Sequence, residues 1–249
     1  MRFDGKVALI TGGAKGIGFA IARLFVAEGG HAVCVSRTPE PTMEPGGGGW
    51  RIAFAQGDVR VSEDCERVLS ETLERHGRLD VLINNAGIIY RNRTVEQTTE
   101  AEWDVTFDTN VKGAFLMSRC ALPALRESHG NIVNVASYVG LVGFRGAAAY
   151  AASKAALVNL TKTMALDHAP DGVRVNCVCP GSVDTEMIRA AWRAHGDPVE
   201  AERLWREKHP MGRIATPDEV AQAVLFLAAD DASFITGAAL PVDGGITAG

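Results

Sequence analysis

The chain has 249 residues, of which 47% are hydrophobic and 22% charged, with a formal net charge of −5. This composition is typical of a globular protein with a substantial core, and the lack of a dense Lys/Arg block excludes nucleic acid or an anionic membrane as the expected main partner. No stretch approaches the roughly 20 apolar residues that span a bilayer, and no apolar signal segment precedes the first strand pattern, so we expect a cytoplasmic protein.

Short apolar runs alternate with longer amphipathic segments along the whole chain. In chain order, the expected elements are a strand at Val7–Thr11, a helix at Gly16–Glu28, strands at His31–Ser36 and Arg51–Gln56, a helix at Ser62–His76 with Ser62 as its N-cap, a strand at Leu79–Asn84, a helix at Glu100–Arg126, a strand at Asn131–Val135, a helix at Ala148–Asp167, a strand at Val173–Val178, helices at Glu186–Lys208 and Pro217–Ala229, and a strand at Ala239–Val242.

The expected strands are continuously apolar, which is typical of parallel strands covered on both faces. Repeated β-α-β units with right-handed crossovers predict a doubly wound, Rossmann-type α/β sheet of about seven strands with helices on both faces. No repeat or linker divides the chain, so we expect one domain over residues 1–249. The segment Thr38–Gly49 contains three prolines and four consecutive glycines, which predict a loop in place of a crossover helix.

The first strand leads into a glycine-rich turn and then a helix. Glycines permit a tight turn and a close approach of the backbone to a pyrophosphate, and the helix N-terminus offers free N–H groups. Such a turn can also be purely structural, but its position between strand and amphipathic helix favours a dinucleotide site. The expected contacts within this turn are Gly12, Ala14, Lys15, Gly16, Ile17 and Gly18.

Tyr150 and Lys154 stand four residues apart in an expected helix. Residues at this spacing share a helix face, so the phenol and the ammonium can point into one pocket. A nearby cation favours the phenolate and lowers the pKa of a tyrosine from its usual value of about 10. The pair therefore predicts an acid/base group that transfers a proton to or from an oxygen atom, although the same spacing also occurs on exposed helix faces.

Three motifs follow one another in a characteristic order: the glycine spacing G-x-x-x-G-x-G, the segment Asn84–Gly87 after the fourth strand, and the Tyr150–Lys154 pair. Together they resemble the short-chain dehydrogenase/reductase family, and the resemblance extends over essentially the whole chain. It implies a nicotinamide dinucleotide as cofactor. The cofactor contacts that it implies here are Asn85, Ala86, Gly87, Tyr150 and Lys154.

By the same resemblance, Asn110 and Ser137 complete a catalytic tetrad with Tyr150 and Lys154. Ser137 is expected to hold the substrate oxygen beside Tyr150, which donates the proton in reduction and accepts it in oxidation. Lys154 is expected also to hold the nicotinamide ribose, and Asn110 to fix a water that returns the proton through Lys154. Taken singly, Ser137 is compatible with a turn cap and Asn110 with an ordinary helix residue. The segment after the sixth strand is expected to contact the cofactor through Pro180, Gly181, Val183 and Thr185.

The second strand ends in Ser36 and Arg37 without a carboxylate, whereas an acidic residue there would bind the adenosine ribose and repel a 2′-phosphate. Arg37 offers a planar fork to a phosphate, and Lys15 can add a second cation. Both are also compatible with solvated surface positions. We therefore expect NADP, with NAD as the alternative. By resemblance, Asp58 and Val59 border the adenine, and Asp58 can accept a bond from its amino group.

The motifs do not fix the substrate, because this fold serves many alcohols and carbonyls. We expect specificity to come from Ile88–Arg93, Tyr138–Arg145 and a lid at about residues 185–212. Arg91, Arg93 and Arg145 can meet an anionic substrate, but arginines in loops are more often solvated.

The predicted function is an NAD(P)-dependent oxidoreductase that transfers hydride between the nicotinamide and the carbonyl or alcohol carbon of a small substrate. One alternative is a dehydratase or epimerase on the same fold, which the short chain disfavours. The other is a non-catalytic dinucleotide sensor, which the complete tetrad disfavours. The five cysteines and six histidines show no zinc-site spacing, so we expect no metal. The resemblance implies a homotetramer or homodimer whose long helices pair across two-fold axes.

Overall fold

A parallel β-sheet forms the centre of the molecule, in a computed structural model that describes residues 1–38 and 52–249. Its strands are β1 Val7–Thr11, β2 His31–Ser36, β3 Ile52–Gln56, β4 Val81–Asn84, β5 Asn131–Val135, β6 Arg174–Pro180 and β7 Ala239–Val242. The seven strands lie in the order β3-β2-β1-β4-β5-β6-β7, and every neighbouring pair is parallel. The predicted loop at Thr38–Gly49 lies, apart from Thr38, outside the described residues.

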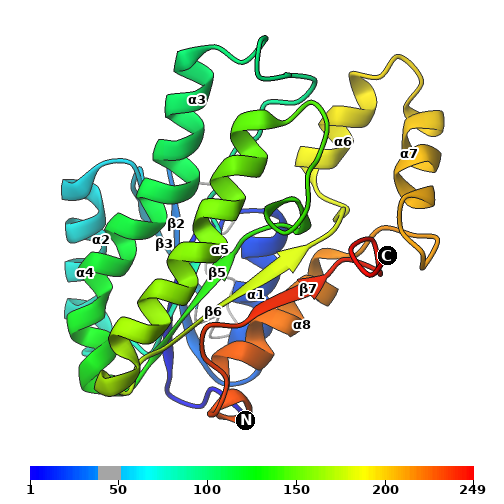
Figure 1. The fold of residues 1–249 in the computed structure, drawn as a ribbon. Coiled ribbons are helices and arrows are strands. Elements are labelled where there is room, and N and C mark those ends of the chain that lie inside the picture. The colour runs from blue at the N-terminus through cyan, green and yellow to red at the C-terminus, as the bar shows by residue number, and fades with distance from the viewer. Residues whose placement is uncertain (39–51) are drawn as a thin grey trace.

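Helices cover both faces of this sheet (Figure 1). They are α1 Gly16–Ala27, α2 Ser62–His76, α3 Glu100–Phe107, α4 Gly113–Ser128, α5 Ala148–His168, α6 Glu186–Arg193, α7 Pro198–Glu207 and α8 Pro217–Ala228. α1 and α8 pack on one face, and α2, α4 and α5 on the other. The predicted doubly wound α/β fold is therefore confirmed. None of the helices in the described part of the chain is long and apolar enough to span a membrane.

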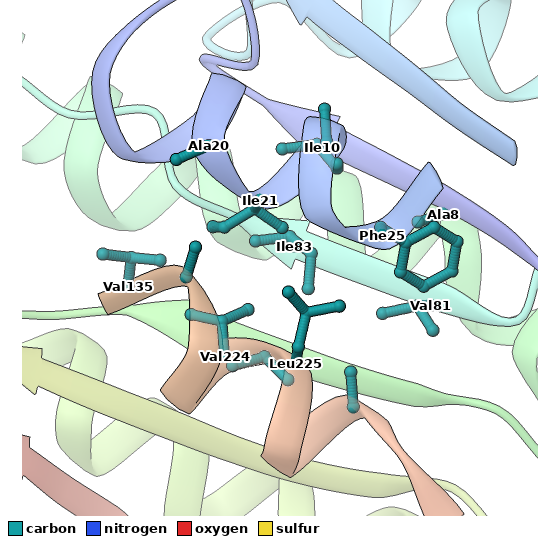
Figure 2. Close-up of a cluster of buried hydrophobic side chains, with 14 of the residues drawn as sticks. Ala8, Ile10, Ala20, Ile21, Phe25, Val81, Ile83, Val135, Val224 and Leu225 are labelled. Atoms are coloured by element: carbon teal, nitrogen blue, oxygen red, sulfur yellow. The ribbon is translucent and has the colours of Figure 1, made fainter. Parts of the chain in front are cut away.

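Alternate residues of the central strands contribute to two separate cores, because successive side chains of a strand point to opposite faces. Ala8 and Ile10 of β1 face α1 and α8, where they meet Ile21 and Leu225 (Figure 2). Leu9, between them, belongs to the core under α2 and α4. Burial on both faces explains why the strands read as continuous apolar runs in the sequence.

The predicted helix at Glu100–Arg126 is interrupted. α3 and α4 are joined by a π-helical turn, Asp108–Lys112, which contains Asn110. Hydrophobic periodicity is read over several turns, so it does not resolve a single widened turn. Such π-helical turns are frequent at functional sites. The N-cap prediction for α2 was also wrong, since Val61 occupies the N-cap and Ser62 is the first helical residue.

The predicted helix at Glu186–Lys208 is two helices, α6 and α7, because the chain turns between them. Gly196 has a φ of 91°, a left-handed conformation that favours glycine. Asp197 then caps α7 by accepting a hydrogen bond from the N–H of Val199 at 3.0 Å. Pro198 occupies the first turn, where its missing N–H has no cost. The sequence Gly-Asp-Pro is thus a helix start signal that the long helical pattern concealed.

The strand order places a topological switch between β1 and β4, because the chain proceeds from β1 outward to β2 and β3 before it returns to β4. In open α/β sheets, ligands bind beyond the carboxyl ends of the strands at such a point. Thr11 ends β1 and Asn84 ends β4, and the two predicted cofactor segments follow them directly. The fold therefore places these two segments side by side.

Candidate active site

The glycine loop after β1 has no room for a side chain at its centre. A Cβ added to Gly18 would lie 2.3 Å from the carbonyl oxygen of Gly12. Gly12 and Gly16 have φ values of 63° and 56°, in the region that favours glycine. The loop ends at Lys15, the N-cap of α1, and no described side chain caps this helix N-terminus. Bare backbone and free N–H groups fit the pyrophosphate of a dinucleotide.

Thr11 and Asn85 fasten the glycine loop to the end of β4. Thr11 Oγ1 accepts hydrogen bonds from the N–H groups of Asn85 at 3.0 Å and Ala86 at 3.1 Å. Asn85 Nδ2 donates to the carbonyl oxygens of Thr11 at 3.0 Å and Gly12 at 3.1 Å. Asn85 thus positions the loop, in addition to the predicted contact with the cofactor. The role of Thr11 was missed, although a polar residue at the end of an apolar strand is a usable signal.

Three residues of the predicted tetrad meet at the end of β5. Lys154 of α5 is 4% exposed, and its Nζ donates to the carbonyl oxygen of Val135 at 2.8 Å. The same Nζ lies 5.7 Å from the centroid of the Tyr150 ring. Ser137 is buried just after β5, and its side chain lies near enough to Tyr150 to act on the pKa of the phenol. The structure therefore brings a hydroxyl, a phenol and an amine together at the carboxyl edge of the sheet.

Asn110 approaches this place from the π-helical turn. Its Oδ1 accepts from the N–H of Ile88 at 2.8 Å, and its Nδ2 donates to the Ile88 carbonyl and to Ser153 Oγ, both at 3.0 Å. A Cβ added to Gly87 would lie 3.3 Å from Asn110 Oδ1 and 3.4 Å from Lys154 Nζ. Asn110 therefore holds the segment after β4 in place, and its role in a water relay stays a prediction.

The segment after β6 reaches the glycine loop from another direction. A Cβ added to Gly16 would lie 3.4 Å from Cγ2 of Thr185, which is the N-cap of α6. Thr185 Oγ1 donates to the carbonyl oxygen of Val183 at 3.3 Å. Pro180 ends β6, and Gly181 follows it. The predicted cofactor contacts in the segment after β6 therefore lie beside those in the glycine loop after β1.

His209 joins the segment after β6 to the chain that follows α7. This buried residue accepts a hydrogen bond at Nε2 from the N–H of Ser182 at 3.0 Å, and its Nδ1 lies 2.9 Å from the carbonyl oxygen of Trp205. Because Nε2 accepts, the ring hydrogen is on Nδ1 and is donated to Trp205. Sequence analysis missed His209, since a single histidine in a polar segment carries no pattern.

The residues predicted for the adenosine end lie around the ends of β2 and β3. Arg37 and Lys15 are exposed, and neither forms an ion pair within the described ranges 1–38 and 52–249. Asp58 is bound by Arg60 at 2.6 Å. Hydrogen bonds from Arg60, and then the charge of Arg37, lower the pKa of Asp58. The remaining predicted contacts are the buried Ala14 and Val59 and the half-buried Ile17, Ser36 and Ala86.

Comparison with known proteins agrees with this arrangement. A family model described as enoyl-(acyl carrier protein) reductase matches residues 12–247. The chain is 44% identical over 253 residues to the meso-2,3-butanediol dehydrogenase of Serratia marcescens, a match that covers 100% of this chain and 97% of the relative. The chain is a short-chain dehydrogenase/reductase.

Solved structures of this family superpose closely on the short-chain dehydrogenase/reductase described here. The ligand-free aldohexose dehydrogenase of Thermoplasma acidophilum gives a TM-score of 0.92 at 35% identity, over 100% of this chain and 96% of that one. Levodione reductase gives 0.95 at 32% identity, over 99% of both chains. The protein is therefore an enzyme that acts on alcohol and carbonyl groups with a nicotinamide dinucleotide, as predicted.

The electrostatics of this short-chain dehydrogenase/reductase differ from the sequence prediction at Tyr150. Burial raises the pKa of Tyr150, while the side chain of Ser137 and the charge of Arg91 act in the opposite direction. Burial also lowers the pKa of Lys154 to about 8. The pKa of Tyr150 therefore lies above its usual value and not below it as predicted, and Lys154 is not among the groups that lower it. A spacing in the sequence cannot report desolvation, which is here the largest effect on both groups.

The lowered pKa of Lys154 predicts a specific pH dependence of stability. Between the folded-state pKa of about 8 and the ordinary value of 10.5, the unfolded chain holds a proton on this lysine that the folded chain has lost. Raising the pH through this interval therefore favours the folded state. Urea unfolding of the cofactor-free enzyme from about pH 7 to about pH 10 should show a rise in the free energy of unfolding that Lys154→Met lacks. If the free energies of unfolding of the wild-type enzyme and of Lys154→Met change with pH in the same way, the lowered pKa does not belong to Lys154.

Proposed function

We propose that the enzyme is an NADP-dependent oxidoreductase that reduces the carbonyl group, or oxidises the alcohol group, of a small substrate with Tyr150 as the acid/base. When bound, the nicotinamide supplies or accepts the hydride. The observation that carries the proposal is the meeting of Ser137, Tyr150 and Lys154 at the same sheet edge as the tightly packed glycine loop after β1.

The roles of the side chains follow from their surroundings. In reduction, Tyr150 donates its proton to the carbonyl oxygen; its raised pKa keeps the hydroxyl protonated at neutral pH. Ser137 donates a hydrogen bond that strengthens as negative charge develops on that oxygen. In oxidation, Tyr150 accepts the proton in its phenolate form, and Ser137 and Arg91 favour that phenolate. Lys154 would bind the nicotinamide ribose hydroxyls, with Asn110 holding the neighbouring backbone in position.

A direct test follows the absorbance of reduced cofactor with a panel of alcohols and ketones. The panel includes meso-2,3-butanediol, an aldohexose and levodione, which the names of the relatives suggest. We expect turnover with at least one member and a higher kcat/KM with NADPH than with NADH. Tight cofactor binding without turnover of any alcohol or ketone would contradict the proposal and favour a dinucleotide sensor.

The proposed preference for NADP rests on Arg37 and Lys15, two exposed cations without a carboxylate partner among the described residues. A guanidinium binds a phosphate through a planar pair of donors. We expect Arg37→Gln to weaken NADPH binding by about tenfold, as for the loss of one charge-assisted hydrogen bond, and to leave NADH binding within about twofold. Fluorescence titration of both cofactors measures this. Arg75→Gln, at an exposed position on α2, is the matched control. Equal losses for both cofactors would contradict the preference.

We further propose that residues 1–249 form one domain in which about 185–212 act as a substrate lid. α6 and α7 project from the sheet as a helical hairpin (Figure 1). They share a small apolar cluster of Ile188, Trp192 and Ala201.

For assembly we propose a homotetramer or homodimer through the long helices α4 and α5, where Phe115 leaves 45% of its surface exposed. Light scattering gives the assembly directly.

A further inference from the structure

Two cations contact the same indole ring beside the proposed active site. Cζ of Arg91, in the segment after β4, lies 5.2 Å from the centroid of the Trp205 ring. Nζ of Lys208, which follows α7, lies 4.3 Å from that centroid and 5.7 Å from the centroid of the Phe144 ring. Contacts between cations and aromatic faces at such distances are attractive. Trp205 and Phe144 therefore hold the two positive groups near each other.

The same aromatic rings continue to the catalytic residues. The Phe144 ring lies 6.2 Å from that of Trp205 and 6.0 Å from that of Tyr138, measured between centroids. Tyr138 directly follows Ser137 in the chain. The charge of Arg91 acts on the pKa of both Tyr138 and Tyr150. Arg91 thus lies within electrostatic reach of the proposed proton donor, and aromatic rings connect both cations to the residue that follows Ser137.

Neither cation is neutralised by a carboxylate of the described residues. Within residues 1–38 and 52–249, Arg91 and Lys208 form no ion pair, whereas Arg93 binds Glu102 at 3.2 Å. Burial lowers the pKa of Arg91, and burial together with the charge of Arg91 lowers the pKa of Lys208. Arg91 is half-buried and Lys208 is exposed. Two like charges close together destabilise each other, and a bound anion would relieve this.

Tyr138 supplies an independent sign of a ligand. The side chain is 6% exposed, and its buried hydroxyl has no hydrogen-bond partner among the described residues. Burial raises the pKa of Tyr138 to about 12, so the hydroxyl keeps its proton and can donate it in a hydrogen bond. A buried donor without an acceptor is costly unless a ligand supplies one.

We propose that the substrate carries an anionic group, a carboxylate or a sulfonate, which Arg91 and Lys208 bind while Tyr150 serves the reacting oxygen. The proposal rests on the proposed oxidoreductase function and names its substrate class. The Arg91 guanidinium presents paired donors, Lys208 a point charge, and the Tyr138 hydroxyl a further donor. Phe144 and Trp205 would contact the carbon chain between the anionic group and the carbonyl.

The test compares anions with neutral analogues of nearly the same shape. The probes are levulinate and methyl levulinate, 4-oxocyclohexanecarboxylate and its methyl ester, and 3-oxobutane-1-sulfonate and its N-methyl sulfonamide. Binding to the enzyme–NADP complex is read from tryptophan fluorescence, and turnover from NADPH oxidation. We expect at least one anion to bind about tenfold more tightly than its neutral analogue, as for a charge-assisted contact. Comparing the affinities of the carboxylates with that of the sulfonate shows which anionic group the site prefers.

Variants locate the anion site. Arg91→Gln and Lys208→Met should each reduce the preference for the anion by about tenfold and leave binding of the neutral analogue and of NADPH within about twofold. Arg145→Gln removes an equal charge from the exposed part of the neighbouring loop and should change nothing. Thermal unfolding of each variant confirms that it is folded.

The outcomes separate the two proposals. If no anion binds better than its neutral analogue, or if Arg145→Gln has the same effect as Arg91→Gln, the anion site is wrong. If anions bind with the expected preference but no alcohol or ketone is turned over, the anion site stands and the proposed oxidoreductase function is wrong.

Discussion

Replacing Tyr150 by Phe should remove turnover and leave cofactor binding intact. The variant loses only the hydroxyl that is proposed to exchange a proton with the substrate oxygen, and positioned proton transfer contributes about 10²- to 10⁴-fold to a rate. We therefore expect kcat to fall by at least about 100-fold, with the dissociation constant for NADPH within about twofold. Steady-state kinetics and fluorescence titration measure the two quantities separately.

Tyr90→Phe is the matched control for this experiment, because it deletes the same atom from a tyrosine that is exposed. Its kcat should stay within about twofold of the wild-type value, and any loss should fall on KM, because Tyr90 lies in the segment Ile88–Arg93 from which specificity is expected. An undiminished rate in Tyr150→Phe, or an equal loss in both variants, would remove Tyr150 from the mechanism. Ser137 then remains as the hydroxyl at this position, and Ser137→Ala would show whether it is needed.

Adding one methyl group at Gly18 should abolish cofactor binding. The new Cβ would lie 2.3 Å from the Gly12 carbonyl oxygen and 2.6 Å from Asn85 Nδ2. Neither atom can move without breaking the bond from Asn85 Nδ2 to that carbonyl, which shapes the loop. We expect the NADPH dissociation constant of Gly18→Ala to rise by at least about 100-fold and the protein to lose about 1–3 kcal/mol of stability, as is usual for overpacking.

Gly143→Ala is its control, since a Cβ there meets nothing within 4 Å and the backbone is not in the left-handed region. Cofactor titration and thermal unfolding of the two variants give the comparison. If Gly18→Ala binds NADPH as Gly143→Ala does, the loop after β1 is not the pyrophosphate site.

The sequence predicts the fold well because the sheet is buried on both faces. All five residues of β1, Val7–Thr11, are buried, and β4 and β5 behave alike, whereas the edge strands β3 and β7 are mostly half-buried. The helical spacing predicts that Tyr150 and Lys154 share a helix face, whereas the position of Ser137 beside them is predicted only through the family resemblance. Local interruptions are less visible: one widened helical turn at Asp108–Lys112 leaves the hydrophobic pattern nearly unchanged.

Quantities that depend on distant parts of the chain could not be predicted. The raised pKa of Tyr150 results from burial, which its own helix does not determine. The sequence favours solvated positions for the loop arginines, and Arg93 and Arg145 are indeed exposed. Arg91, however, is half-buried against Trp205, which lies more than a hundred positions later in the chain. No spacing rule connects residues so far apart.

The two hydrogen bonds of His209 require its imidazole to be in one particular chemical form. It accepts a hydrogen bond from Ser182 through one nitrogen and donates to Trp205 through the other. An imidazolium ion carries hydrogen on both nitrogens and accepts nothing. The connection that fixes the base of the α6–α7 hairpin to the β6 loop therefore exists only while this ring is uncharged and in one of its two tautomers.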